Sequence, residues 1–288
     1  MPNFKKLTKQ YQTNACVALQ QFIRINSVYD ASTIGPGAPY GAGIQKALDY
    51  VAKLGHDFGW SVDKCDGYCT ELTIGDEGPI IGVYAHSDVV PVSGKWDLEP
   101  FSGTFKDGRI WGRGAIDDKG PLVACIYAAK ALKDAGLIKG FRVRIVSGGD
   151  EERGSSCLAY YFEHLKKEHS VLGFTPDSDW PLIYGEKNMR GYELSYEGDF
   201  GPVIAMEGGV VANAVCDKLL VTIKKDPAFV AYLKDNNIEC DTSEAGEVSI
   251  ISFKGKSAHG STPHLGVNAG AIALKAIGSF YHLDHLTK

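Results

Sequence analysis

The first 60 residues carry apolar side chains at helical spacing. Between Phe4 and Ile25, apolar or small residues recur every three or four positions, which predicts an amphipathic helix. The segments Gly35-Pro36-Gly37 and Pro39-Tyr40-Gly41 follow, and their glycines and prolines predict a loop. Residues 43–58 then show a second amphipathic pattern, which predicts another helix.

The middle of the chain alternates short apolar runs with helical patterns. The runs predict buried strands at residues 79–85, 141–146 and 171–174. The helical patterns predict helices at residues 120–136 and 156–167. Alternating strands and helices predict an α/β fold, in which a sheet is flanked by helices on both faces.

Beyond residue 185 the pattern is of a different kind. Strand patterns occur at residues 192–196, 219–223 and 247–253. Helical patterns occur at residues 227–234 and 267–280. We therefore predict a second segment of strands and helices of another kind and place the boundary near residues 185–190.

Composition and charge exclude several classes of protein. The chain has 288 residues, of which 44% are hydrophobic and 23% are charged, and this is ordinary globular composition. The net charge is −5, so no basic excess is available to bind nucleic acid. No apolar run approaches the roughly 18 residues of a membrane span, and the first residues lack the apolar segment of a secretory signal. Without such a run we expect no membrane partner. The seven cysteines are scattered and odd in number, which fits reduced thiols, so we expect a cytoplasmic protein.

Four segments that contain His or acidic residues follow strand or turn signals. They hold the pairs His86 and Asp88, Asp117 and Asp118, Glu151 and Glu152, and Asp177 and Asp179. Loops at the carboxyl ends of strands in an open α/β sheet converge on one crevice, so these side chains should meet there. One His and several carboxylates at one point repel unless a cation neutralises them. Imidazole and carboxylate ligands suit Zn²⁺ or a similar divalent ion.

The spacing within the segments suggests separate roles. His86 and Asp88 share a face in extended geometry, so Asp88 can hold the second ring nitrogen of a ligand imidazole. Glu151 and Glu152 are adjacent and point in different directions, so one can bind metal while the other acts as general base towards water. Asp117 lies in a glycine-flanked turn with room to bridge two ions about 3.5–4 Å apart.

Each segment alone has a simpler interpretation. A single His at a strand end is usually a hydrogen-bonded polar residue. A Glu pair is usually a solvated turn, and an Asp pair before a helix usually caps that helix. Four such segments at strand ends together favour a metal site.

The same residues resemble a known family, the M20 metallopeptidases. The motifs are His86-Ser-Asp88-Val-Val-Pro followed by Trp96, Gly112-Arg-Gly-Ala-Ile-Asp117-Asp118-Lys-Gly120, Asp150-Glu151-Glu152, and Pro176-Asp177. The stretch from Thr175 to Lys187, which contains Gly185-Glu186-Lys187, is most similar to the dipeptidase V branch of Gram-positive bacteria. The resemblance covers essentially the whole chain.

The resemblance implies a co-catalytic dizinc amidohydrolase that cleaves dipeptides or other short peptides. By similarity, His86 and Asp177 bind one Zn²⁺, Glu152 binds the other, and Asp117 bridges the two. Mn²⁺ and Co²⁺ tolerate the same ligands. The expected partner is a small peptide substrate, and no obligate protein partner is evident.

The resemblance also implies roles for residues that do not bind metal. Asp88 orients His86, and Glu151 is the general base and then the acid towards the leaving amine. His259, in a segment similar to the family's lid, would stabilise the oxyanion, and Asn213 resembles a lid residue that touches substrate. Residues 1–187 would be the N-terminal part of a zinc-peptidase-like catalytic domain, and residues 188–288 a partial, truncated lid domain.

The chain departs from the family pattern in its last part. The family's second zinc needs a His near the C-terminus, and a later Arg of the lid binds the substrate carboxylate. Neither position exists here, and His282 and His285 do not match that motif. We therefore expect an N-terminal portion of a longer family member.

Two alternatives to a dipeptidase remain open. An N-acyl amino acid deacylase of the same family would use the same catalytic residues. An inactive N-terminal fragment would lack the last zinc ligand.

Overall fold

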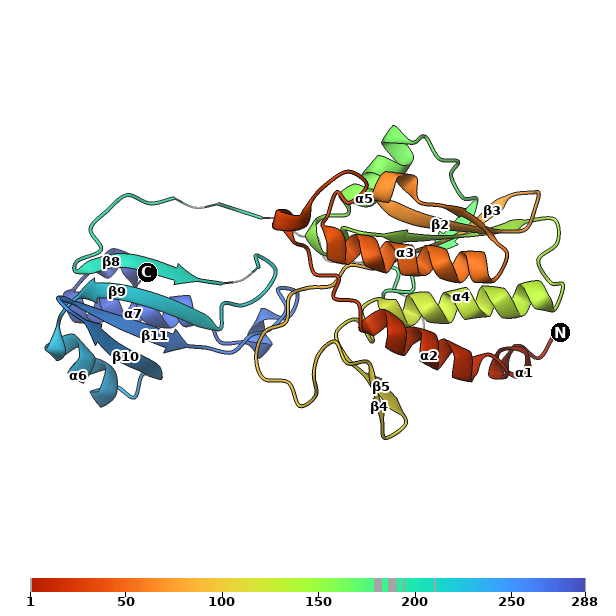
Figure 1. Ribbon diagram of the computed structural model, residues 1–288. Coiled ribbons are helices and arrows are strands. Elements are labelled where there is room, and N and C mark those ends of the chain that lie inside the picture. The colour runs from red at the N-terminus through yellow and green to blue at the C-terminus, as the bar shows by residue number, and fades with distance from the viewer. Residues whose placement is uncertain (1, 179–182, 186–190, 194, 210, 288) are drawn as a thin grey trace. The chain divides into compact units, whose positions relative to one another are not determined.

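The computed structural model describes residues 2–178, 183–185, 191–193, 195–209 and 211–287. It divides into two compact units, Met1–Ile183 and Tyr184–Lys288, each with its own sheet and core (Figure 1). The assignment of residues 1–187 to a catalytic domain and of residues 188–288 to a lid stays a prediction.

The first unit contains seven strands and nine helical segments in the part of the chain that the structure describes. The strands are β1 (Ser61–Asp63), β2 (Cys69–Ile74), β3 (Ile80–His86), β4 (Thr104–Lys106), β5 (Arg109–Trp111), β6 (Arg142–Gly148) and β7 (Leu172–Phe174). The main helices are α1 (Phe4–Lys9), α2 (Gln12–Ile23), α3 (Ala42–Asp57), α4 (Lys119–Asp134) and α5 (Ser156–Ala159). Single turns are η1 (Ala31–Thr33), η2 (Cys65–Gly67), η3 (Glu151–Arg153) and the π-helical η4 (Tyr160–His164).

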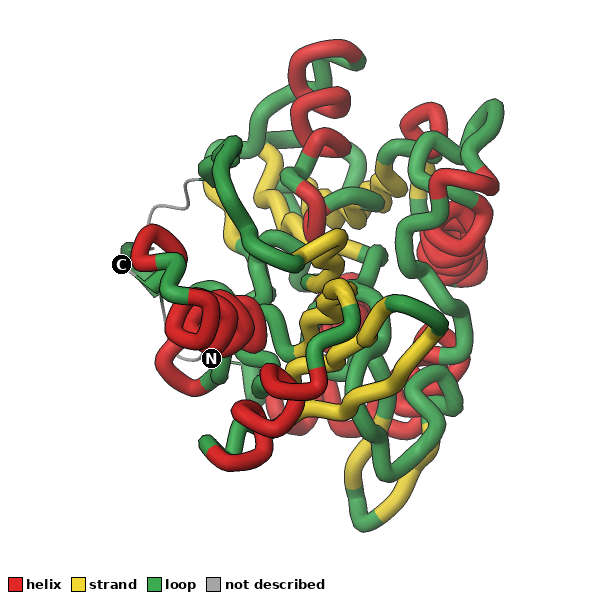
Figure 2. The backbone as a smooth tube through the Cα atoms, turned by 90° about the vertical axis from the view of Figure 1, so that its left-hand side faces the viewer, coloured by secondary structure: helices red, strands yellow, loops and turns green. Residues whose placement is uncertain are grey.

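The sheet of the first unit has five strands in the order β1-β2-β6-β3-β7. β3 runs parallel to both of its neighbours, β6 and β7, whereas β2 is antiparallel to β6 and to β1. The register places Val83 of β3 beside Ile145 of β6 and Phe174 of β7. The carboxyl ends of β6, β3 and β7 therefore lie at the same edge of the sheet. A loop without helix or strand, residues 87–103, leaves this edge and leads to β4 (Figure 1). Figure 2 shows the loops of the chain in green beside its helices and strands.

Helices pack against one face of this sheet to form the main core. Alternate side chains of a strand point to opposite faces, so Leu72 of β2 and Ile145 of β6 can bury the same face. They join a buried apolar cluster with Phe22 of α2, Val51 of α3 and Leu122 of α4.

The opposite face carries a smaller core. Cys69 of β2 and Val146 of β6 pack there with Cys157 of α5 and Tyr161 of η4. The predicted fold class, a mixed sheet flanked by helices, is therefore confirmed for this unit (Figure 1).

The second unit is an antiparallel sheet in the order β10-β11-β9-β8 with two main helices. Its elements are β8 (Val203–Gly208), β9 (Lys218–Lys224), α6 (Pro227–Asp235), β10 (Cys240–Ala245), β11 (Val248–Lys254), η5 (Pro263–Leu265), α7 (Ala269–Tyr281) and η6 (Asp284–Leu286). Ile223 and Ile251 of the sheet bury against Phe229 of α6 and Ile277 of α7.

Most of the predicted elements are present. The predicted strands at residues 79–85, 141–146, 171–174, 219–223 and 247–253 correspond to β3, β6, β7, β9 and β11. The predicted helices at residues 43–58, 120–136, 227–234 and 267–280 correspond to α3, α4, α6 and α7.

Three predicted elements were wrong in extent or kind. The single helix from Phe4 to Ile25 is two helices that break at residues 10–11, where the Tyr11 hydroxyl donates to Asp134 of α4 at 2.5 Å. The helix predicted at residues 156–167 ends at His164, because η4 is a π-helix and Lys166 soon after it has a positive φ of 54°. The described residues of the predicted strand 192–196 form no strand, and the side chains that suggested burial, Tyr192 and Tyr196, are exposed.

The sequence pattern also missed six strands, namely β1, β2, β4, β5, β8 and β10. β2 shows why, because both of its faces are covered and polar Thr70 and Glu71 are buried with Leu72. Its burial therefore follows neither alternation nor a continuous apolar run. Among the described residues, no helix combines the length and the apolar character needed to cross a membrane.

Candidate functional site

The predicted site residues of the first unit gather where three parallel strands end. His86 is the last residue of β3, Glu151 follows the end of β6, and Asp177 follows the end of β7. Asp117 reaches the same place from the loop before α4. Loops at the carboxyl ends of neighbouring parallel strands share one edge, and this explains how distant segments converge.

His86, Asp117 and Asp177 form the centre of the site. The Nε2 atom of His86 lies 3.0 Å from Oδ1 of Asp117 and 3.3 Å from Oδ2 of Asp177. One donor atom from each of the three residues falls within 4.8 Å of the others. The His86 side chain is only 2% exposed, whereas that of Asp117 is 58% exposed, so the trio opens to solvent on its carboxylate side.

Asp88 holds the other side of the imidazole. The Nδ1 atom of His86 lies 3.0 Å from the backbone carbonyl of Asp88 and 3.3 Å from its carboxylate. The carboxylate also accepts hydrogen bonds from the backbone N–H groups of Glu151 (3.1 Å) and Glu152 (3.0 Å). One buried side chain thus fixes both the ring of His86 and the turn that carries the two glutamates.

These contacts bring the negative charges of two carboxylates close to the Nε2 atom of His86. With the Nδ1 proton donated to Asp88, a neutral ring would direct its Nε2 lone pair at two carboxylates. Burial acts to lower the pKa of His86, but the hydrogen bonds with Asp117, Asp177 and Asp88 outweigh it and raise the pKa well above its ordinary value. The site therefore needs a positive charge at this point, and a proton or a metal ion can supply it. The donor set of one imidazole and two carboxylates fits a divalent ion such as Zn²⁺.

Glu151 and Glu152 differ in their contacts and in their exposure. The carboxylate of Glu151 lies 4.0 Å from Nε2 of His86, and its side chain is 48% exposed. Glu152 is more buried, and its Oε1 atom has no hydrogen-bond partner among the residues that the structure describes. Burial raises the pKa of Glu151, and burial together with the Asp117 carboxylate raises the pKa of Glu152 to about 7. An unpartnered buried oxygen beside carboxylates is a suitable ligand for a cation.

The two residues after Asp117, Asp118 and Lys119, make contacts that the sequence did not predict. Asp118 occupies the cap position of α4, but its side chain does not cap the helix and instead accepts from the backbone N–H of His86 at 3.2 Å. Lys119 is fully buried and donates to the carbonyls of Phe22 (3.2 Å) and Ile25 (2.7 Å) at the end of α2. Burial raises the pKa of Asp118 to about 7 and lowers that of Lys119 to about 7. The loop that presents Asp117 is thus tied to β3 on one side and to α2 on the other.

The two site residues predicted in the second unit lie next to each other. The backbone of His259 pairs with that of Ala214, and the N–H of Gly260 donates to the carbonyl of Asn213 at 2.6 Å. The Nδ1 atom of His259 accepts from the backbone N–H of Ser261 at 3.2 Å, so a neutral ring carries its proton on Nε2. His259 is exposed, which leaves this N–H able to donate to a ligand. Glu186 and Lys187, which suggested the dipeptidase V branch, lie outside the described residues.

Comparison with known proteins gives a family match and named relatives. Residues 82–247, more than half of the chain, match the family described as peptidase family M20/M25/M40. A Bacillus subtilis (strain 168) protein named "Putative dipeptidase YtjP" is 36% identical over 267 residues, which cover 88% of this chain and 57% of the relative. A Staphylococcus aureus (strain bovine RF122 / ET3-1) protein named "Putative dipeptidase SAB1611c" is 31% identical over 297 residues, which cover 98% of this chain and 62% of the relative.

The chain thus spans about three fifths of the length of these relatives. Among solved structures, human carnosine dipeptidase 1 matches with a TM-score of 0.48 and 22% identity, covering 58% of this chain and 38% of that one.

The raised pKa values predict an unusual pH dependence for the metal-free chain. Asp118, Glu151 and Glu152 hold protons in the folded state that they release on unfolding, because their pKa values are higher when folded. The free energy of unfolding should therefore fall as the pH rises from about 5 to about 7. Asp63, whose pKa is lowered, contributes stability that is already complete above its ordinary pKa and so does not offset this fall. Lys119, whose pKa is lowered to about 7, acts in the opposite direction only as the pH approaches 7.

Urea unfolding with a chelator present, at several pH values across this range, measures the effect. Glu152→Gln should flatten the dependence, because it removes one of the titrating groups. A free energy of unfolding that stays constant or rises across the range would contradict the prediction.

Proposed function

This chain belongs to peptidase family M20/M25/M40, and we propose that the protein is a zinc-dependent peptidase that hydrolyses dipeptides or other short peptides. The observation that carries the proposal is the pair of carboxylates, from Asp117 and Asp177, that face the buried Nε2 of His86. The names of the relatives, which describe dipeptidases, support the choice of substrate class.

The contacts suggest which residues bind metal and which residue orients a ligand. His86, Asp117 and Asp177 would hold one ion, and Glu152 with Asp117 would hold a second. A divalent ion supplies positive charge that polarises a carbonyl oxygen and lowers the pKa of water. Asp88 keeps the His86 ring in one orientation through Nδ1, so that Nε2 faces the ion.

Glu151 is suited to move the proton in the reaction. Its carboxylate is close to Nε2 of His86 but half exposed, so it can contact a water molecule at the site. Its raised pKa brings its proton affinity closer to that of water activated for attack. We assign Glu151 as the base that takes a proton from the attacking water and then delivers it to the nitrogen of the leaving amine.

His259 supplies a hydrogen-bond donor for the oxyanion. Because Ser261 donates to Nδ1, the neutral ring presents Nε2–H as a donor. A donor placed in advance at the carbonyl oxygen stabilises the negative charge that develops there as water attacks. Asn213, whose backbone is bonded to that of Gly260, is proposed to contact the substrate from the same part of the second unit.

The first test removes the base and keeps the metal ligands. Glu151→Gln should lower the rate of dipeptide hydrolysis by about 10²–10⁴-fold, because proton transfer by a positioned carboxylate contributes this much. Zinc content should stay unchanged, since the trio is intact. Glu163→Gln, an exposed glutamate of η4, is the matched control and should keep both activity and zinc.

Assays on N-acetyl amino acids beside a dipeptide panel decide the substrate class, with zinc, manganese or cobalt supplied. Faster release from N-acetyl amino acids would replace the peptidase proposal by a deacylase. Full activity of Glu151→Gln would contradict the role of Glu151.

The activity should also fall steeply in acid. Protonation of His86 and of the carboxylates competes with the metal ion, so metal is lost as the pH decreases. Rates and bound zinc measured on the same samples from about pH 8 to about pH 4 should decline together. A rate that is undiminished near pH 4 would be incompatible with a metal site built on His86.

A further inference from the structure

Asp177 is presented by a strand that has little burial of its own. β7 has three residues, and Leu172 and Phe174 are 69% and 53% exposed. Its one neighbouring strand in the described sheet is β3, which it meets at Ile81–Val83. Apolar contacts therefore stabilise the position of β7 only weakly, although the contact between Asp177 and His86 requires a fixed position.

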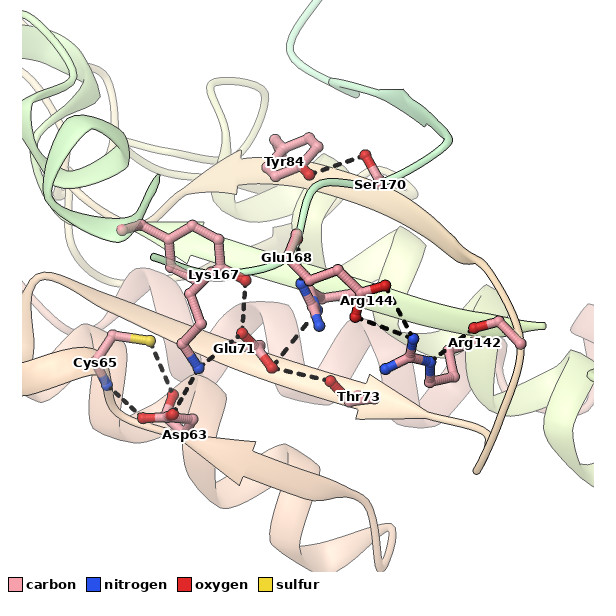
Figure 3. Close-up of polar contacts among 12 residues, drawn as sticks. Asp63, Cys65, Glu71, Thr73, Tyr84, Arg142, Arg144, Lys167, Glu168 and Ser170 are labelled. Carbon is pink, nitrogen blue, oxygen red and sulfur yellow. Dashed lines mark hydrogen bonds and ion pairs between the residues drawn. The ribbon is translucent and has the colours of Figure 1, made fainter. Parts of the chain in front are cut away.

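Polar contacts hold the segment that leads into β7, residues 165–171. Arg144, on the sheet face beneath it, donates from its guanidinium to the backbone carbonyl of Glu168 at 2.7 Å. Arg142 contacts the Glu168 carboxylate at 3.1 Å, and the hydroxyls of Ser170 and Tyr84 are 3.0 Å apart (Figure 3).

A buried glutamate, Glu71 of β2, lies on the same face of the sheet and contacts the same segment. It accepts from the hydroxyl of Tyr161 at 2.5 Å and lies 3.2 Å from the amine of Lys167. The same amine contacts Asp63 of β1 at 2.7 Å, and the guanidinium of Arg144 lies 3.6 Å from Glu71 (Figure 3). We call these five residues the Glu71 cluster.

The Glu71 cluster contains two carboxylates and two cations, so its charges balance. Glu71 and Arg144 are 8% and 6% exposed, and at such burial an unpaired charge is strongly unfavourable. Lys167 supplies one of the two cations, so its contacts with Glu71 and Asp63 favour a position over the sheet. The cluster therefore fixes the backbone five residues before β7 begins.

We propose that Lys167 and Arg144 are positioning residues for Asp177. By fastening residues 165–171 to buried Glu71, they set where β7 starts and therefore where the Asp177 carboxylate meets His86. This inference rests on the proposed metal site, because its readout is the affinity of that site.

Lys167→Met tests the proposal, with Lys166→Met as the matched control. Lys166 is the preceding residue and is exposed. Co²⁺ is the probe, because its visible absorption reports binding without any need for hydrolysis. Lys167→Met should weaken Co²⁺ binding by about 10–100-fold, the range seen when residues that orient metal ligands are lost. Lys166→Met should leave the affinity unchanged, and Lys167→Arg should restore most of it.

A double-mutant cycle separates positioning from a general loss of stability. In an Asp177→Asn background, Lys167→Met should change the Co²⁺ affinity by less than about twofold, because the ligand it positions is already gone. An equal loss in both backgrounds, or an unchanged affinity of Lys167→Met alone, would overturn the proposal.

If Lys167→Met does not fold, the pair Glu71→Gln with Lys167→Met removes one charge of each sign and should show the same loss of affinity. If the unmodified chain binds no Co²⁺ at all, both the proposed metal site and this inference are wrong. A tight site in the unmodified chain with no effect of Lys167 would overturn the inference alone.

Discussion

The contact of one buried imidazole with two carboxylates is the constraint on which the site depends. Nδ1 of His86 is hydrogen-bonded to Asp88, so Nε2 is the ring nitrogen that faces Asp117 and Asp177. Such an arrangement is stable only with a positive charge between the three groups. A proton can provide it in the absence of metal, and a divalent ion replaces that proton when bound. The chemistry proposed for the site follows from this exchange.

The surrounding structure serves to keep these groups in place despite their repulsion. Asp88 binds two backbone N–H groups of the glutamate turn as well as the imidazole. Lys119, buried without a carboxylate partner among its described hydrogen bonds, ties the Asp117 loop to the end of α2 through two carbonyls. On the opposite face of the sheet, the Glu71 cluster balances its own charges and holds the segment before β7. Each ligand of the trio is therefore supported by hydrogen bonds that extend away from the site.

The sequence predicted the convergence of the site because convergence follows from topology. His86, Glu151 and Asp177 each follow an apolar run, and parallel neighbouring strands end at one edge. The orientation of His86 by Asp88 followed from a spacing of two residues. The sequence did not predict the bond from His86 to Asp118, because an Asp before a helix usually caps it.

Contacts between residues far apart in the chain account for most of what the pattern missed. Glu71 and Tyr161 are 90 residues apart, and Lys167 and Asp63 are 104 apart, so no local periodicity records them. β2 escaped prediction for the same reason. Thr70 donates to the carbonyl of Leu48 in α3, and Glu71 contacts Tyr161 of η4 and Lys167 of the following segment. The roles of Asp88, Glu151, Glu152, His259 and Asn213 remain predictions.

Zinc analysis of the purified chain, after loading with zinc and dialysis, shows whether His86 and its two carboxylates bind a metal ion. His86→Gln and the control Glu163→Gln are measured beside it. We expect the unmodified chain and the control to keep at least about one zinc per chain, and His86→Gln to lose it. A chain that keeps no zinc, or a His86→Gln variant that keeps as much as the control, would contradict a metal site built on His86.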